Sequence, residues 1–178
     1  MLSYDQTFKI LLLSDPEVDK SCLFPGYLTD IPQPDDQKTI GIEIISKTLV
    51  IQKKRYKLQF WDLDREKRFR FLLPTYCLGA NAAILFYDVT RSQALDNIGE
   101  LTNIVRQKSG DIPVMLVGLI PDEKSERHVS TEEGMEIAVS RNLNGFIECN
   151  VRTGDNVEKF FEDLTRLILA RAGLLKVA

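Results

Sequence analysis

Short apolar runs alternate with helical patterns along the chain, and this alternation constrains the fold more than any other feature. The runs predicted to be strands are 8–13, 40–51, 55–63, 82–89, 114–119 and 145–149. Their nearly continuous apolar character is typical of parallel strands covered on both faces. The second and third flank residues 52–54 and predict a hairpin. We therefore expect an α/β fold with a mostly parallel six-stranded sheet, one antiparallel edge strand and helices on both faces.

Four helices are predicted between these runs. Two are the segments 68–78 and 92–108. Ser130 and Glu133 form a capping box that opens a third, which runs to about residue 141. Asp155 and Glu158 predict a similar start for the last helix. Its apolar side chains repeat at helical spacing and should pack on the sheet: Val157, Phe160, Phe161, Leu164, Leu167 and Ile168.

Length and composition limit the classes of function. The 178 residues suit one domain, 1–178, with a core at about 7–172. A net charge of -3 gives no strong field toward nucleic acid, so we expect no nucleic-acid partner. Cys22, Cys77 and Cys149 are too scattered for a disulfide framework or a metal site. This favours a reduced, cytoplasmic setting. The sequence shows no signal-peptide pattern and no C-terminal cysteine to prenylate, so we expect no direct membrane anchor.

A phosphate-binding loop is expected where the first strand ends. Leu13 ends that strand, and Lys20-Ser21 follows seven residues on, where a helix should begin. This is the setting of the GxxxxGK[ST] motif. In that motif glycines let backbone N–H groups converge on phosphates, the lysine reaches the terminal phosphates, and the hydroxyl binds magnesium. Residues 14–21 are called the phosphate loop below.

Several segments in order resemble the Ras/Rab-like small GTPases. They are KILLLSDPEVDKSCL around the phosphate loop, KTIG at 38–41 for switch I, LQFWDLDREKRFRFLLPTYCLGANAAILFYDVT around switch II, and ECNVRTGDNVEKFFEDLTRLI for the last loop and helix. The resemblance covers residues 7–172. It implies GTP or GDP with magnesium as the ligand, contacted by Lys20, Ser21, Thr39, Asp62 and Asp122. In such a site Ser21 and Thr39 would be the magnesium ligands.

The phosphate loop departs from this family in both its glycines and its charge. Ser14 and Asp19 replace the two signature glycines, and Pro16 removes an N–H donor. Three carboxylates and Lys20 give residues 14–21 a net charge of -2. Two or three such charges at ~4–6 Å from a triphosphate cost on the order of several kcal/mol at an effective dielectric of ~20. The loop therefore argues against tight triphosphate binding.

The other nucleotide motifs are altered as well. Arg65 replaces the glycine that meets the γ-phosphate, and Glu66 replaces the glutamine that orients the attacking water. A glutamate there adds negative charge near an anionic transition state. The guanine motif NKxD reads Leu119-Ile120-Pro121-Asp122, which keeps only its aspartate, and the SAK loop reads Asn150-Val151-Arg152. Pro32 falls where an aromatic ring would stack on guanine.

The switch II segment is the second functional signal. In the family this element docks effectors, and a basic, aromatic surface suits a protein partner with acidic groups. The alternative is that Phe69 and Leu72 pack inward while the charges only solvate the helix. The residues predicted to form this interface are Arg65, Lys67, Arg68, Phe69 and Arg70.

Two functions of different class remain open. The first is a non-catalytic pseudo-GTPase that acts as a protein-interaction module, with no cofactor and no GTP hydrolysis. In that case we expect Lys20 to pair internally with Asp19, Asp62 or Glu66. The second is a GTP-binding switch with weak intrinsic hydrolysis, since the side chains that touch phosphate, magnesium and base are retained. A different nucleotide in the pocket is a third option, which the acidic loop disfavours.

Overall fold

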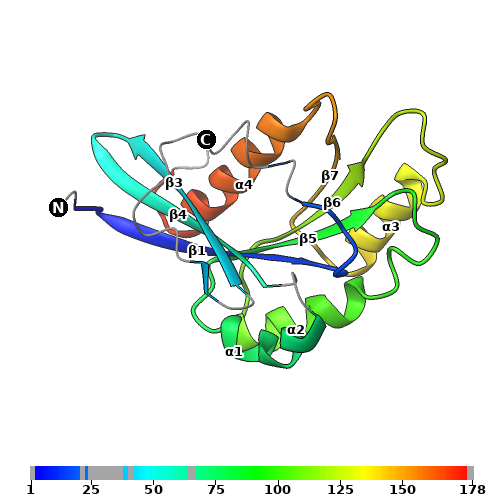
Figure 1. Cartoon of the computed structure of the whole chain (residues 1–178). Helices are drawn as coiled ribbons and strands as arrows, with labels where there is room; N and C mark the ends of the chain where they lie inside the picture. Colours follow the sequence, from blue (N-terminus) through cyan, green and yellow to red (C-terminus); the bar gives the residue numbers. More distant parts are fainter. Residues whose placement is uncertain (1–2, 21–22, 24–37, 40–41, 64–66, 176–178) are drawn as a thin grey trace.

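The computed structural model describes residues 3–20, 23, 38–39, 42–63 and 67–175, and it contains one mixed sheet (Figure 1). The strand order is β2-β3-β4-β1-β5-β6-β7. The strands are β1 Gln6–Ser14, β2 Lys38–Thr39, β3 Ile42–Ile51, β4 Lys54–Asp62, β5 Ala82–Asp88, β6 Val114–Ile120 and β7 Gly145–Asn150. The helices are the 3-10 helix η2 Lys67–Leu72, α1 Leu73–Tyr76, α2 Ile98–Ser109, α3 Thr131–Ser140 and α4 Val157–Arg171.

The predicted α/β fold class is confirmed. β1 pairs in parallel with β4 and β5, and β6 pairs in parallel with β5 and β7. β3 is antiparallel to β4, as the hairpin predicted. Within the described residues the sheet has one strand more than the expected six, because the two-residue β2 pairs with β3 outside it. The turn of the hairpin places Gln52 and Lys53 at positive φ, which suits a tight connection between twisted strands.

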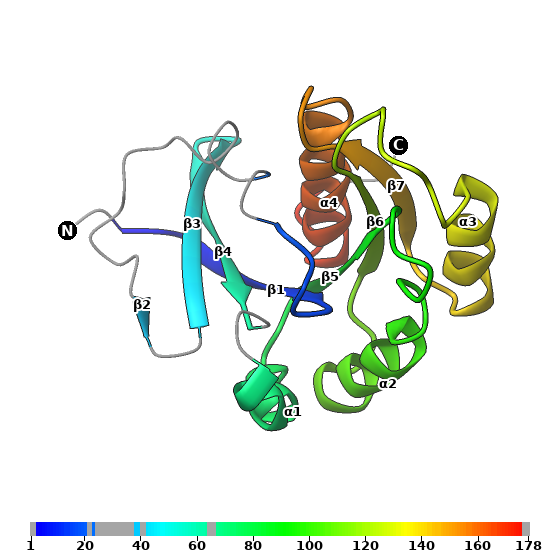
Figure 2. The same ribbon diagram turned by 45° about the vertical axis from the view of Figure 1, so that its right-hand side comes forward.

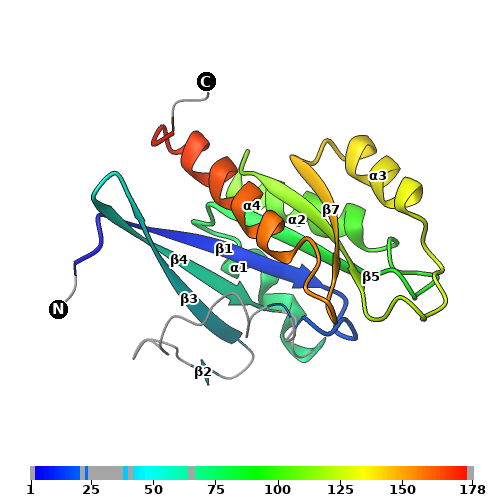
Figure 3. The ribbon, with the colours of Figure 1, turned by 90° about the horizontal axis from the view of Figure 1, so that it is seen from above.

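Helices cover the sheet on both faces. Figure 1 shows α4 above the strands and α1 and α2 below them, and Figure 3 shows α4 lying across the sheet. Figure 2 places α3 and α4 on opposite sides of β7. The predicted stripe of α4 packs against β1, β4 and β5, with Phe160 and Leu164 fully buried. The opposite core contains Leu101 of α2 and Ala138 of α3. The apolar side chains of these helices therefore face the sheet on both sides, as their helical spacing requires.

Three predicted helices begin or divide differently from the expectation. α2 begins at Ile98 rather than 92, because the preceding residues form successive turns and Asp88 accepts hydrogen bonds from Thr90. The N-cap position of α4 is Asn156, in the left-handed region and without a side-chain capping bond, rather than Asp155. The Asp155 N–H instead donates to Thr153 Oγ1. The segment 68–78 divides into η2 and α1, and Pro74 stands in the first turn of α1, where its missing N–H costs nothing.

The capping box of α3 is confirmed in both directions. Ser130 Oγ accepts from the Glu133 N–H, and the Glu133 carboxylate accepts from the Ser130 N–H. Across the described part of the chain, every helix is too short or too polar to span a bilayer.

Candidate functional site

Lys20 turns back from the phosphate loop onto the end of the sheet. Its Nζ lies 3.1 Å from Asp62 Oδ1 and donates to Ser14 Oγ at 2.7 Å. Asp62 ends β4, which runs parallel to β1, so the two strand ends meet at one edge of the sheet. Lys20 is only 5% exposed. Of the three internal partners predicted for Lys20, the described residues show Asp62, and Glu66 lies outside them.

Ser14 shapes the loop at the position of the first signature glycine. It is fully buried, and its hydroxyl donates to the Asp15 carbonyl at 3.0 Å while it accepts from Lys20. The Asp15 carbonyl also accepts the Val18 N–H at 3.0 Å. A loop that cradles phosphate must keep its N–H groups directed at the ligand. Here the Val18 N–H is used inside the loop itself.

The loop carboxylates face basic and amide groups from neighbouring segments. Asp15 Oδ1 lies 3.8 Å from Arg70 Nη1 in η2 and accepts a 2.5 Å hydrogen bond from Asn97 Nδ2, just before α2. Glu17 forms an ion pair with Arg91, in the connection after β5. The negative charge predicted for this loop is thus met by side chains of the chain itself.

The residue expected to read a base is also engaged. Asp122 follows β6, and its Oδ2 accepts from Arg152 Nη1 at 2.7 Å while Oδ1 accepts from the Lys124 N–H at 3.2 Å. Asn150 ends β7 and is buried, and its Oδ1 accepts from the N–H groups of Arg152 and Thr153, each at 3.0 Å. Asn150 therefore fixes the loop that carries Arg152 toward Asp122.

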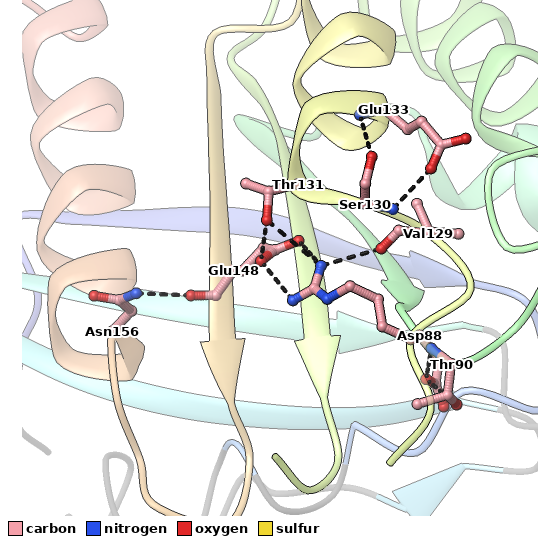
Figure 4. A network of polar contacts seen from close by, with 9 residues as sticks. Asp88, Thr90, Val129, Ser130, Thr131, Glu133, Glu148 and Asn156 are labelled. Carbon is pink, nitrogen blue, oxygen red and sulfur yellow. Dashed lines mark hydrogen bonds and ion pairs between the residues drawn. The ribbon is translucent and has the colours of Figure 1, made fainter. Parts of the chain in front are cut away.

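A polar network that the sequence interpretation missed lies beside this region (Figure 4). Arg127 donates hydrogen bonds from Nη1 and Nη2 to the two oxygens of the Glu148 carboxylate, at 2.8 and 3.0 Å, and the Thr131 hydroxyl also donates to this carboxylate. The hydrogen bonds to Glu148 raise the pKa of Arg127, and burial raises the pKa of nearby Tyr87. Arg127 lies in the charged segment 126–128, in which His128 is exposed. Its partner Glu148 is 21 residues away along the chain, so no local sequence signal marks the pair.

The remaining predicted site residues divide by position. Ser21, Arg65 and Glu66 lie outside the described residues, as does Pro32. Thr39 belongs to β2, and Lys67, Arg68 and Phe69 belong to η2, but their side chains are not among those described. In the same segment Leu72 is half-buried and Phe71 is 74% exposed. The Trp61 and Tyr76 rings are 6.3 Å apart between β4 and α1, with Lys9 Nζ 4.2 Å from the Trp61 ring.

Comparisons with known proteins identify the family to which this fold belongs. The model of the Ras family matches residues 9–170. Ras-related protein RABC2a of Arabidopsis thaliana is 40% identical over 177 residues, covering 97% of this chain and 83% of the relative. Ras-related protein SEC4 of Candida albicans is 36% identical over 93% of this chain and 79% of the relative. Human Ras-related protein Rab-8B is 34% identical over 95% of this chain and 82% of the relative.

Proposed function

The chain belongs to the Ras family of small GTPases, and we propose that it is a non-catalytic member that acts as a protein-interaction module. One observation carries the proposal: Lys20, the lysine that would reach the phosphates, is buried and bonded to Ser14 and Asp62. A nucleotide would have to break this arrangement before it gained the lysine. Cys77 and Cys149 are buried among apolar side chains, in keeping with the reduced, cytoplasmic setting expected from the sequence.

The described residues do not fit a triphosphate as they stand. A phosphate cradle needs converging N–H donors and positive potential. The loop instead presents the Asp15 and Glu17 carboxylates near its tip and uses the Val18 N–H internally. Ser14 also fills space where a glycine would let the backbone approach a ligand. A γ-phosphate would therefore have to compete with the Asp15 and Glu17 carboxylates for the nearby arginines, and it would find fewer N–H donors than the motif supplies.

The base position gives a second, weaker argument. Both carboxylate oxygens of Asp122 already accept hydrogen bonds, from Arg152 and from the Lys124 N–H. A purine edge would compete with Arg152 for Oδ2. Leu119 replaces the asparagine of the guanine motif and is buried in β6, and its side chain has no polar group to offer a base.

Hydrolysis has little support from the residues at the switch II position. Glu66 stands where the family has a water-orienting glutamine, and a carboxylate opposes the negative charge of the transition state. We therefore assign no catalytic residue. The switch segments are proposed to serve recognition instead.

The proposed docking surface is centred on η2 and α1. Phe71 is 74% exposed, and Tyr76 of α1 packs against Trp61 of β4 with the two rings tilted by 48°. Aromatic and arginine side chains are enriched at the centres of protein interfaces. The basic residues and the exposed ring favour a protein partner that offers an apolar pocket surrounded by acidic groups. The basic residues predicted there are Arg65, Lys67, Arg68 and Arg70.

The test is the nucleotide content of the purified protein, followed by thermal unfolding with millimolar GTP and magnesium. We expect no guanine nucleotide on chromatography of the denatured protein and no thermal shift. A ligand present at 100 times its dissociation constant would add about 2.7 kcal/mol to the free energy of unfolding. The S14G/D19G variant, which restores both signature glycines, is the matched control. Stoichiometric GDP in the wild-type protein would overturn the proposal.

A GTP-binding switch with weak hydrolysis is the second candidate. Lys20, Asp62 and Asp122 keep the family's positions at the carboxyl ends of the sheet, where ligands of open α/β sheets bind. The Arg152–Asp122 pair is exposed and would yield at small cost. Under this alternative the nucleotide and its magnesium would displace the pairs of Lys20 and Asp122, and the thermal shift above would be positive.

A further inference from the structure

We propose that Asp15 fixes the switch II segment, residues 67–76, to the phosphate loop through Arg70, so that this segment keeps one conformation whether or not nucleotide is present. The inference rests on the proposed function, because it specifies how the docking surface around Phe71 is held. Its predicted consequence is partner binding that does not depend on nucleotide.

The geometry around Asp15 carries the first step. One carboxylate oxygen, Oδ1, faces Arg70 Nη1 at 3.8 Å and Asn97 Nδ2 at 2.5 Å. The Asp15 and Arg70 side chains are 24% and 32% exposed. Partial burial reduces screening by solvent, so this pair is held more strongly than a fully exposed one. Asp15 thus joins three segments far apart in sequence: β1, η2 and the start of α2.

A second contact holds the loop itself in place. Glu17 pairs with Arg91, and Arg91 lies in the turns that connect β5 to α2. The Arg91 N–H donates to the Asp88 carbonyl at 3.2 Å, which fixes that turn to the end of β5. The phosphate loop is therefore attached to the β5–α2 connection through both Asp15 and Glu17. Because these contacts hold the phosphate loop in place, Asp15 can fix the position of Arg70 and does not follow its movements.

The carboxylate of Asp15 supplies a negative charge next to the switch II segment, as the γ-phosphate of the bound nucleotide does in a nucleotide switch. In such switches the γ-phosphate orders the loops, and hydrolysis releases them. Asp15 is covalently part of the chain, so its negative charge is never released. Arg70 is adjacent to Phe71, and only two residues separate it from the start of α1 at Leu73. Fixing Arg70 therefore also restricts the backbone that presents the exposed Phe71 ring.

Hydrogen–deuterium exchange of the full chain tests the proposal. The informative variants are D15N and D15A. An asparagine at 15 keeps an oxygen that accepts from Asn97 but loses the charge that attracts Arg70, whereas alanine loses both. D111A is the matched control, because Asp111 also pairs with an arginine, Arg171 at 3.0 Å.

We expect D15N to speed exchange of the amides at 70–76 by about twofold to fivefold, with the first turn of α2 unchanged. D15A should speed exchange at both places, and D111A at neither. In the wild-type protein, millimolar GTP and magnesium should leave the protection of 70–76 unaltered. If D15A fails to fold, D15N alone decides the question.

Two results would overturn the inference. One is unchanged exchange at 70–76 in D15N. The other is a change of protection at 70–76 when nucleotide is added to the wild-type protein. The proposed function fails separately: a thermal shift with GTP while 70–76 keep their protection would refute the non-catalytic assignment and leave the role of Asp15 intact.

Discussion

Arg152 Nη1 lies 2.7 Å from Asp122 Oδ2, and this contact joins the loop after β7 to the loop after β6. The two side chains are 68% and 36% exposed. The guanidinium offers N–H donors to the same carboxylate that would accept hydrogen bonds from the edge of a guanine. If Asp122 has the base-reading role that the resemblance implies, Arg152 occupies with its own donors the oxygen that a guanine would need.

Removal of Arg152 should barely alter stability. We expect R152A and D122A each to change the free energy of unfolding by less than about 1 kcal/mol, because the pair is largely solvated. Urea denaturation of the single and double variants measures their coupling. If the GTP-binding alternative holds, R152A should also bind guanine nucleotide up to about fivefold more tightly. A coupling well above 1 kcal/mol would contradict this view of the pair.

Removal of Lys20 should be far more damaging. K20M leaves the buried Asp62 carboxylate without its lysine, and we expect a loss of about 3–5 kcal/mol in urea denaturation. The double variant K20M/D62L should recover much of that loss, since an apolar pair leaves no charge to desolvate. K159M is the control, because Lys159 pairs with Asp163 on the exposed face of α4. Equal effects of K20M and K159M would show that the Lys20 pair is not structural.

Gly134 in α3 should not accept a side chain. A Cβ there would lie 2.3 Å from Tyr87 Oη and 2.8 Å from Phe146 Cε2. Although alanine favours helix by about 1 kcal/mol, we expect G134A to destabilise the protein by about 1–3 kcal/mol because the core is overpacked. Adding Y87F should restore part of the loss. The control is G99A in α2, whose Cβ meets the flexible end of Arg141, so a neutral or stabilising effect is expected in thermal unfolding.

The capping box makes stability depend on pH. The hydrogen bond from the Ser130 backbone N–H, with a smaller contribution from the Ser130 side chain, lowers the pKa of the Glu133 carboxyl below its usual 4.5. The unfolded chain therefore binds the proton first, so this contribution is complete above pH 4.5 and is lost as the pH falls through the lower folded-state pKa. E133Q should flatten the acid side of a stability–pH curve, because it removes the titrating carboxyl that accepts from the Ser130 backbone N–H. E136Q is the control, since Glu136 is an exposed glutamate of the same helix beyond its first turn. An unchanged curve in E133Q would refute the assignment.

Local patterns predicted most of the architecture. The apolar runs located β1 and β3–β7, and the spacing of Ser130 and Glu133 located the start of α3, because these signals depend on near neighbours. The boundaries that were missed depend on competing local bonds. α2 starts late because Asp88 and Thr90 support turns. α4 starts at Val157 because Asn156, just before it, adopts positive φ and donates to the Glu148 carbonyl.

The sequence by itself determined the family, the fold class and the replacement of the nucleotide motifs, since these are written in residue types and their order. It also restricted the partners of Lys20 to a few carboxylates. Only the tertiary structure established that Asp62 is one of them, because the parallel pairing of β1 with β4 brings Asp62 to the end of the phosphate loop. The same holds for Asp15 with Arg70, Asp122 with Arg152 and Arg127 with Glu148. Charges act through space, and their separation along the chain does not predict their distance in the fold.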